Sequence, residues 1–209
     1  ALDAYRRFIM MYGSTAMGID RIKFDDLFDE VKEKHTRGRL NIAASKKVGD
    51  TDVNEDELAE VITKFKALYK KEIKKDFPQD PIEQLWGAIG AVFNSWMAEK
   101  AVTYRRVENL VGIKGTAVNV MQMVFGNKGN TSGTGVCFTR DPNSGENVFY
   151  GDYLFNAQGE DVVAGIRTPI KLSEFEKEDK KAYDQLCKVR ALLEDHYKDM
   201  QDMEFTVEE

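Results

Sequence analysis

Two acidic residues near the end of the chain carry the clearest chemical pattern in the sequence. In "DMQDMEFTVEE", Asp202 and Glu204 stand two residues apart, and Met203, Phe205 and Val207 occupy the alternate positions. Residues i and i+2 of an extended strand project from the same face, so the segment predicts a strand with one apolar face and two converging carboxylates. Such a pair suits Mg²⁺, which binds one or two carboxylates and keeps waters and phosphate oxygens as its other ligands. The alternative is a solvent-facing strand edge, where charges are common.

A glycine-rich stretch, "FGNKGNTSGTGV" at residues 125–136, is the second candidate. Its four glycines alternate with small polar residues and are Gly126, Gly129, Gly133 and Gly135. Such a loop exposes backbone N–H groups and hydroxyls, which is what the binding of phosphate oxygens requires. It matches neither the P-loop pattern nor the dinucleotide-binding fingerprint. The alternative is a tight connection between two strands, in which glycine only permits a positive φ.

The segment "NAQGEDVVAGIRTP" at residues 156–169 is the third candidate. Gly159 and Gly165 bracket a short apolar run, and Arg167 follows. A guanidinium group near a phosphate site binds oxyanions through paired N–H donors, so we take Arg167 as a candidate cofactor-binding residue. The alternative is a surface hairpin with an ordinary exposed arginine.

Other chemistries find little support in the residues present. The two histidines, His35 and His196, belong to no cluster with zinc spacing, and no serine stands in a nucleophile-elbow pattern. The net charge of −6 argues against nucleic acid as a partner, because phosphate backbones require a basic surface. No apolar run is long enough to span a membrane. Cys137 and Cys187 lie in apolar-patterned segments, which predicts free thiols in a reducing compartment.

The first 80 residues are predicted to be a helical subdomain. Apolar residues recur at helical spacing from Leu2 to Tyr12 and from Ile22 to Val31. The polar stretch 32–56 has no clear period and predicts a long loop or an insertion. A third helix is predicted to start at Asn54, with Glu57 placed for a capping box. "FPQDP" then marks a subdomain boundary.

Residues 81–209 are predicted to form a second domain that contains a sheet. A helix begins at Pro81 with Asp80 as its cap, and its broad apolar stripe predicts packing onto a sheet. "TAVNVMQMVFG", residues 116–126, predicts a strand buried on both faces. "GVCFTRDPNSGENVFYGDYLFNA" predicts two strands joined by a turn, and an amphipathic helix then leads into the final strand. This order of elements indicates an α+β fold.

Three stretches taken together resemble one known family. "TAVNVMQMVFGNKGNTSGTGVCFTRDPNSGE", "NAQGEDVVAGIRTP" and "DMQDMEFTVEE" occur in this order and resemble the nucleotide-binding region of the pyruvate, phosphate dikinases. The resemblance covers residues 81 to 209 strongly. It implies an ATP-grasp fold in the C-terminal portion, with a helical subdomain before it. It also implies interconversion of ATP, phosphate and pyruvate with AMP, pyrophosphate and phosphoenolpyruvate, by way of a histidine on a separate swivelling domain.

The resemblance assigns roles to single residues. Asp202 and Glu204 match the acidic pair that the family uses for catalysis with ATP and its Mg²⁺, and Thr134 and Gly135 match the loop on the phosphate side. Phosphoryl transfer requires positioning and charge neutralisation more than covalent help from the protein.

The adenine side of the site carries one departure from the family. Met123 and Val124 match the strand that passes the adenine. The family often has "Q-x-M-V" there, whereas Met121 occupies the glutamine position and Gln122 follows it. An adenine contact from a glutamine side chain at that position is therefore not expected.

The resemblance also indicates that the sequence is a piece of a longer chain. The family's ATP-binding Lys and Arg in a glycine-rich segment would precede Ala1, and a strand of the "LYFLQTR" kind would follow Glu209. We therefore expect the piece alone to be inactive and the full-length protein to be a homodimer in the cytoplasm or an organelle. Two alternatives stay open: a related dikinase such as phosphoenolpyruvate synthase, and a binding module without catalysis.

Overall fold

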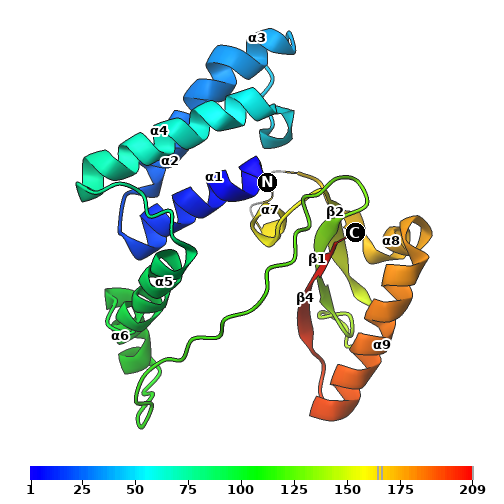
Figure 1. Ribbon diagram of the computed structural model, residues 1–209. Coiled ribbons are helices and arrows are strands. Elements are labelled where there is room, and N and C mark those ends of the chain that lie inside the picture. The colour runs from blue at the N-terminus through cyan, green and yellow to red at the C-terminus, as the bar shows by residue number, and fades with distance from the viewer. Residues whose placement is uncertain (164, 166, 209) are drawn as a thin grey trace. The chain divides into compact units, whose positions relative to one another are not determined.

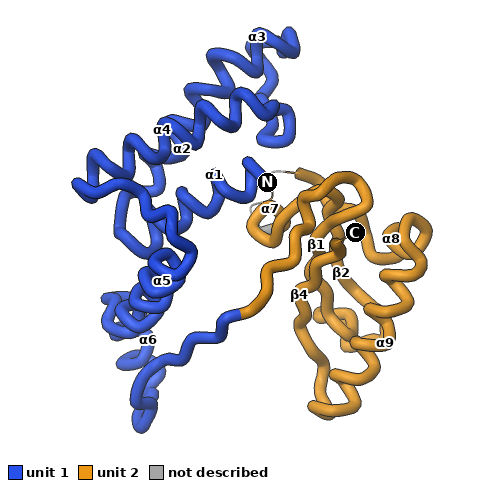
Figure 2. Tube along the Cα trace, in the orientation of Figure 1, with its two compact units in different colours: residues 1–120 blue, residues 121–209 orange. Residues whose placement is uncertain are grey.

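The chain forms two compact units, residues 1–120 and residues 121–209 (Figure 2). A computed structural model describes residues 1–163, 165 and 167–208. Helices followed by an antiparallel sheet confirm the predicted α+β class (Figure 1). Residues 81–120 belong to the first of these units when the chain is divided by its internal contacts. The predicted division into a helical subdomain and a second domain at residue 80 remains a prediction.

The first unit is built from helices. They are α1 (Leu2–Met11), the π-helical turn η1 (Tyr12–Ala16), α2 (Arg21–Val31), the π-helical turn η2 (Lys32–Thr36), α3 (Arg37–Arg39), the 3₁₀ turn η3 (Asp50–Asp52), α4 (Glu55–Ile73), α5 (Pro81–Ser95) and α6 (Glu99–Val107). Helix α4 packs along α1 and α2 (Figure 1). Phe24 of α2 and Phe65 of α4 are fully buried and meet edge to face with their ring centroids 5.0 Å apart.

The predicted start of the third helix is confirmed in detail. The side chain of Asn54 accepts a hydrogen bond from the backbone N–H of Glu57, and the Glu57 side chain accepts one from the N–H of Asn54, so that a complete capping box precedes α4. At α5 the predicted cap is confirmed, because the Asp80 side chain accepts a hydrogen bond from the N–H of Ile82, the second helical residue.

The polar stretch 32–56 differs from the predicted loop, because the helix continues through η2 and α3 to Arg39. Lys32 lies 2.7 Å from an Asp29 carboxylate oxygen and 3.0 Å from one of Asp50, and its side chain is buried. Thr36 is fully buried and donates to Glu57. Asp50 and Glu57, two of these partners, are distant in the sequence, and apolar periodicity does not detect such contacts.

Two predictions of burial are wrong. The α5 stripe does not form a buried face, since Ile82, Trp86 and Phe93 are 59%, 67% and 52% exposed. Residues 116–126 form no strand, and Met121 in their middle is 83% exposed. A strand-like composition needs a neighbouring strand for its hydrogen bonds, and no pairing among the described residues includes this segment. Within the described residues, no helix is both long and apolar enough to cross a bilayer.

The second unit contains a four-stranded antiparallel sheet with the order β3-β2-β1-β4. Its elements are β1 (Gly133–Phe138), β2 (Tyr150–Phe155), α7 (Gly159–Val163), β3 (Ile170–Lys171), α8 (Leu172–Glu178), α9 (Lys180–Tyr197) and β4 (Asp202–Val207). The hairpin, the amphipathic helix and the last strand are therefore confirmed. The β1–β2 turn begins as expected, because the Asp141 carboxylate accepts from the N–H groups of Asn143 and Ser144.

Helices α8 and α9 cover one face of this sheet. Phe175 of α8 and Leu186 of α9 pack with Cys137, Tyr153 and Met203, which project from β1, β2 and β4. The rings of Tyr153 and Phe175 stack with centroids 4.1 Å apart. The other face of the sheet carries the alternate residues of each strand, and the candidate carboxylates are among them.

Both cysteines are free thiols, as predicted, but their surroundings differ. Burial, aided by the negative charge of Asp202, raises the pKa of Cys137 to about 12, so its thiol stays protonated at neutral pH. Cys187 lies half-buried on α9.

We expect iodoacetamide to alkylate Cys187 in the native protein while Cys137 reacts only after denaturation, as peptide mass spectrometry would measure. Equal rates of reaction under native conditions would contradict this burial.

Candidate functional site

The register of β1 and β4 places the two candidate carboxylates on one open face of the sheet. Glu204 pairs with Val136 and Asp202 with Phe138. Both acidic side chains are exposed, whereas Met203 between them is only 8% exposed. The alternation predicted from the sequence is confirmed, and two carboxylates share the same side of one strand.

Thr134 of β1 lies on the same face of the sheet as the two carboxylates, two residues before Val136, the partner of Glu204. It pairs with Thr206, and the two side-chain oxygens are 3.4 Å apart. Its hydroxyl donates to the carbonyl oxygen of Ala157 at 2.9 Å, and the residue is only 4% exposed. Thr134 therefore links β1 to β4 and to the segment after β2. A phosphate contact by Thr134 remains a prediction.

Gly135 faces the opposite side, towards the core under α8 and α9. A Cβ atom at this position would lie 2.4 Å from Cζ of Phe205 and 2.7 Å from the backbone oxygen of Asp152. Only glycine allows the Phe205 ring to lie this close to β1. The structure thus gives Gly135 a packing role, and its assignment to nucleotide binding remains a prediction.

The glycine-rich loop ends at a buried hydroxyl that organises its backbone. Ser132 is fully buried, and its Oγ accepts a hydrogen bond from the N–H of Lys128 at 2.8 Å. The same hydroxyl lies 3.0 Å from the carbonyl oxygen of Gly126 and 2.9 Å from that of Gly129, so its single proton can be donated to either. One side chain therefore fixes three backbone groups of residues 126–129.

The loop is also fixed against the segment that follows β2. The N–H of Ala157 donates to the Gly126 oxygen, and the N–H of Asn156 donates to the Ser132 oxygen, both at 2.8 Å. A Cβ atom on Gly126 would lie 2.2 Å from the Ala157 oxygen, so no larger residue fits. Gly126 thus allows two backbones to approach closely. This is compatible with a phosphate-binding loop and with a tight connection between strands.

The tip of the loop has the groups that an oxyanion requires. Among the described contacts, the backbone N–H groups of Gly129, Asn130 and Thr131 donate to no protein acceptor. Asn130 and Thr131 are exposed, and Gly129 has a φ of +137° that favours glycine. Successive N–H groups at a turn bind an anion where they converge, so phosphate binding at this tip remains a prediction.

The start of the loop is tied to the end of β4 through Glu208. One carboxylate oxygen of Glu208 accepts from the backbone N–H of Phe125, and the other forms an ion pair with the Lys128 ammonium group. The lysine and the backbone N–H lower the pKa of Glu208, so the carboxylate stays ionised at neutral pH.

Arg167 holds the backbone at the end of β2. Its guanidinium donates to the carbonyl oxygens of Asn156 at 2.9 Å and Phe155 at 2.7 Å, and the residue is half-buried. Helix α7 occupies the start of the segment, so the alternative of a surface hairpin with an exposed arginine is wrong. Ala164 and Ile166 of the same segment lie outside the described residues.

The adenine-side candidates lie in the extended segment before the loop. Met123 is 56% exposed and Val124 is 49% exposed. They have the accessibility that a ligand contact needs, and their role remains a prediction.

The two carboxylates fit Mg²⁺ better than a metal that needs a complete protein cage. No group of three or more His, Cys, Asp or Glu side chains in the described part of the chain could hold a metal ion. Mg²⁺ needs only one or two carboxylates when waters and phosphate oxygens complete its octahedron. Asp152 lies in the same cross-strand row as Glu204, but Lys171 neutralises it at 2.7 Å.

Reasoning from the sequence missed three residues that shape this region: Ser132, Lys128 and Glu208. A signal for Glu208 was present in the sequence, because it continues the two-residue alternation of Asp202, Glu204 and Thr206, although β4 ends at Val207. Ser132 stands in the glycine-rich stretch, but nothing local distinguishes its buried hydroxyl from the exposed one of Thr131.

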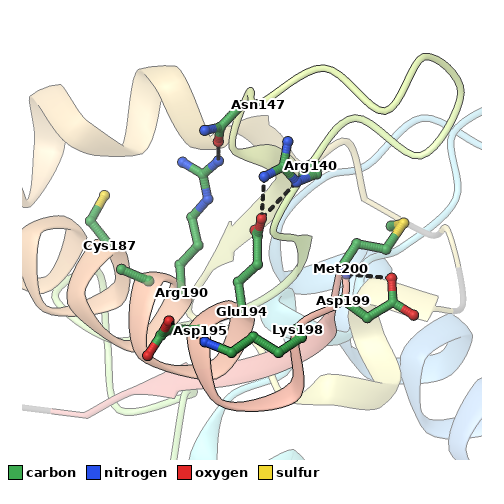
Figure 3. Close-up of a pocket in the computed structure, with 10 residues that line it drawn as sticks. Arg140, Asn147, Cys187, Arg190, Glu194, Asp195, Lys198, Asp199 and Met200 are labelled. Atoms are coloured by element: carbon green, nitrogen blue, oxygen red, sulfur yellow. Dashed lines mark hydrogen bonds and ion pairs between the residues drawn. The ribbon is translucent and has the colours of Figure 1, made fainter.

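A hollow separate from these residues lies beside the C-terminal half of α9, with a volume of about 800 Å³ (Figure 3). Its charged groups already have protein partners. Arg140 pairs with Glu194, Lys198 with Asp195 at 2.6 Å, and Arg190 donates to Asn147. Because these charges are already paired, we assign no ligand to the hollow.

Comparison with known proteins identifies the family. The family model described as "Pyruvate phosphate dikinase, AMP/ATP-binding domain" matches residues 32–183, which is most of the chain. The chain belongs to this family. The match to the dikinase nucleotide-binding domain includes the glycine-rich loop and Arg167, whereas Asp202 and Glu204 lie beyond it.

Pyruvate, phosphate dikinases align with the whole of the chain, including β4. It is 49% identical to pyruvate, phosphate dikinase of Clostridium symbiosum and 48% identical to pyruvate, phosphate dikinase 1, chloroplastic, of Zea mays. It is 46% identical to the Rhizobium meliloti (strain 1021) dikinase. The chain spans only 23%, 21% and 23% of these relatives.

Proposed function

We propose that the chain is the nucleotide-binding part of a pyruvate, phosphate dikinase. In this role it binds ATP with Mg²⁺ and phosphorylates a histidine on a separate, swivelling domain of the same longer chain. The whole protein then interconverts ATP, phosphate and pyruvate with AMP, pyrophosphate and phosphoenolpyruvate. The observation that carries the proposal is the juxtaposition on one unit of an exposed carboxylate pair and a rigidly held loop with free N–H groups.

The residues of this chain contribute positioning and charge. The N–H groups of residues 129–131 and the ammonium group of Lys128 bind phosphate oxygens, and Arg167 holds the neighbouring backbone in place. Asp202 and Glu204 would hold Mg²⁺, which when bound neutralises charge on the phosphates. A fixed loop keeps the phosphate chain in line for transfer without rearrangement, which is the main demand of phosphoryl transfer.

The adenine would lie along Met123 and Val124, which are exposed beside the loop that binds the phosphates. We further propose that residues 81–209 are part of an ATP-grasp domain, with residues 1–80 as a helical subdomain. We also propose that the full-length protein is a homodimer in the cytoplasm or an organelle. The chloroplastic names of several relatives accord with an organelle for some members.

The related-dikinase alternative differs in its acceptor. The relatives named here are pyruvate, phosphate dikinases, which favours inorganic phosphate as the second acceptor. A full-length assay that requires phosphate and releases pyrophosphate would support this choice. Release of phosphate without any requirement for added phosphate would support a phosphoenolpyruvate synthase instead.

Calorimetric titration with Mg·ATP tests the proposal. We expect the full-length protein to bind Mg·ATP and residues 1–209 alone to bind it weakly or not at all, because further phosphate-binding groups belong to the longer chain. Titration with ATP in EDTA is the control and should give weaker binding, since the carboxylate pair then repels the phosphates. Absence of Mg·ATP binding by the full-length protein would refute the proposed function.

A further inference from the structure

We propose that Glu208 is a positioning residue that latches the glycine-rich loop onto β4 and so orders the phosphate-binding groups before the nucleotide arrives. The proposal rests on the proposed function for its consequence in catalysis. The latch itself is a statement about the free protein.

Glu208 is placed for this role by the alternation of β4. It comes directly after β4, which ends at Val207, and continues the two-residue spacing of Asp202, Glu204 and Thr206. The residue that contacts the loop therefore follows immediately after the strand that carries the candidate metal ligands.

The two oxygens of Glu208 bind the loop at two points three residues apart. One accepts from the backbone N–H of Phe125, and the other pairs with the ammonium group of Lys128. A carboxylate is suited to this double contact because each oxygen accepts independently. Both bonds carry charge assistance, which makes them stronger than neutral hydrogen bonds.

The latch complements the buried hydroxyl of Ser132. Ser132 fixes the backbone of residues 126–129 from the inside, while Glu208 fixes residues 125 and 128 from β4. Lys128 is held by both, through its N–H and through its ammonium group. Two of the three donors of the ammonium group remain for phosphate oxygens. Ordering the loop in advance reduces the entropy that nucleotide binding must otherwise remove.

Hydrogen exchange of the full-length protein without nucleotide tests the latch. Glu208→Ala removes both contacts, and we expect exchange of peptides covering residues 125–132 to become about tenfold faster. Glu208→Gln keeps an acceptor for the N–H of Phe125 but loses the ion pair with Lys128. Lys128→Met loses the same ion pair. Each substitution should therefore raise the exchange rate by less than Glu208→Ala does. The variant that combines Glu208→Gln with Lys128→Met should exchange no faster than either of these single variants, because both substitutions remove the same ion pair.

Exposed Glu178 at the end of α8 provides the matched control. Glu178→Ala should leave exchange of the loop unchanged. Unchanged exchange in Glu208→Ala as well would overturn the latch.

Steady-state kinetics of the same variants test the consequence for the nucleotide. Glu208→Ala should raise the KM for ATP about tenfold with a smaller change in kcat, because the loop must be ordered at each binding event. A faster-exchanging loop with an unchanged KM would overturn the link to nucleotide binding. If the unaltered protein bound no Mg·ATP, the proposed function would fail, and hydrogen exchange would still decide the latch.

Discussion

Replacing Asp202 with Asn, or Glu204 with Gln, is expected to reduce ATP-dependent phosphorylation of the histidine in the full-length protein by about 10²- to 10³-fold. Both substitutions keep the size of the side chain and remove one negative charge. The charge is what Mg²⁺ requires of this face, since no third carboxylate in the described part of the chain joins the pair in a metal-binding group. Transfer of ³²P from β-labelled ATP to the protein would measure the loss.

The exposure of both residues makes this experiment informative. Neither carboxylate forms an ion pair within the described residues, so neutral amides should leave β4 folded. Binding of Mn²⁺ in the presence of ATP, followed by electron paramagnetic resonance, should weaken in parallel with activity.

Asp199→Asn is the matched control, because it lies in the same segment just before β4 and is also exposed. It should retain full activity. If Asp202→Asn and Glu204→Gln also retained activity while the protein still bound ATP, a binding module without catalysis at this pair would be favoured.

Replacing Glu57 with Ala is expected to destabilise the helical unit by about 3 kcal/mol. The carboxylate is buried, with 6% exposure of the residue, and it accepts from Arg39, Thr36 and the N–H of Asn54 at 2.8 to 3.0 Å. Its removal leaves the Thr36 hydroxyl buried without this acceptor and breaks the capping box of α4. Hydrogen exchange of α4 amides in the full-length protein would measure the change in opening free energy.

The same residue gives the unit a dependence on pH. Hydrogen bonding from Arg39, with smaller contributions from Asn54 and Thr36, lowers the pKa of Glu57 from 4.5 to about 2. Because the folded-state pKa lies below the unfolded one, the stabilisation is complete above pH 4.5 and is lost as the pH falls towards 2. Glu57→Ala should flatten this part of the stability profile.

Glu55→Ala, two residues earlier on α4, is the control for Glu57→Ala. Glu55 is exposed in the first helical turn, where its loss should cost only about 0.3–1 kcal/mol through the helix dipole. Equal effects of the two substitutions would contradict the role of Glu57 as the acceptor that joins α4 to α3 and η2.

Local rules were sufficient for part of the fold. The capping box at Asn54 and Glu57, the turn at Asp141 and the alternation of β4 are encoded within a few residues of each feature. The same holds for the family, since the motifs that carry it are short and contiguous. Such features depend on the geometry of one turn or one strand, which the order of residues specifies directly.

Tertiary contacts decided the remainder. The segment around Met121 reads as a buried strand and lies exposed, because pairing depends on a neighbour that its own residues do not specify.

The candidate site follows the same division. By itself, the sequence determined that Asp202 and Glu204 share a face and that a glycine-rich loop precedes β1. The structure decided that Thr134 bonds across to Ala157, that Gly135 faces the core, and that Ser132 and Glu208 hold the loop. These contacts join residues distant along the chain. Their partners are set by how the strands pack and not by any period within one strand.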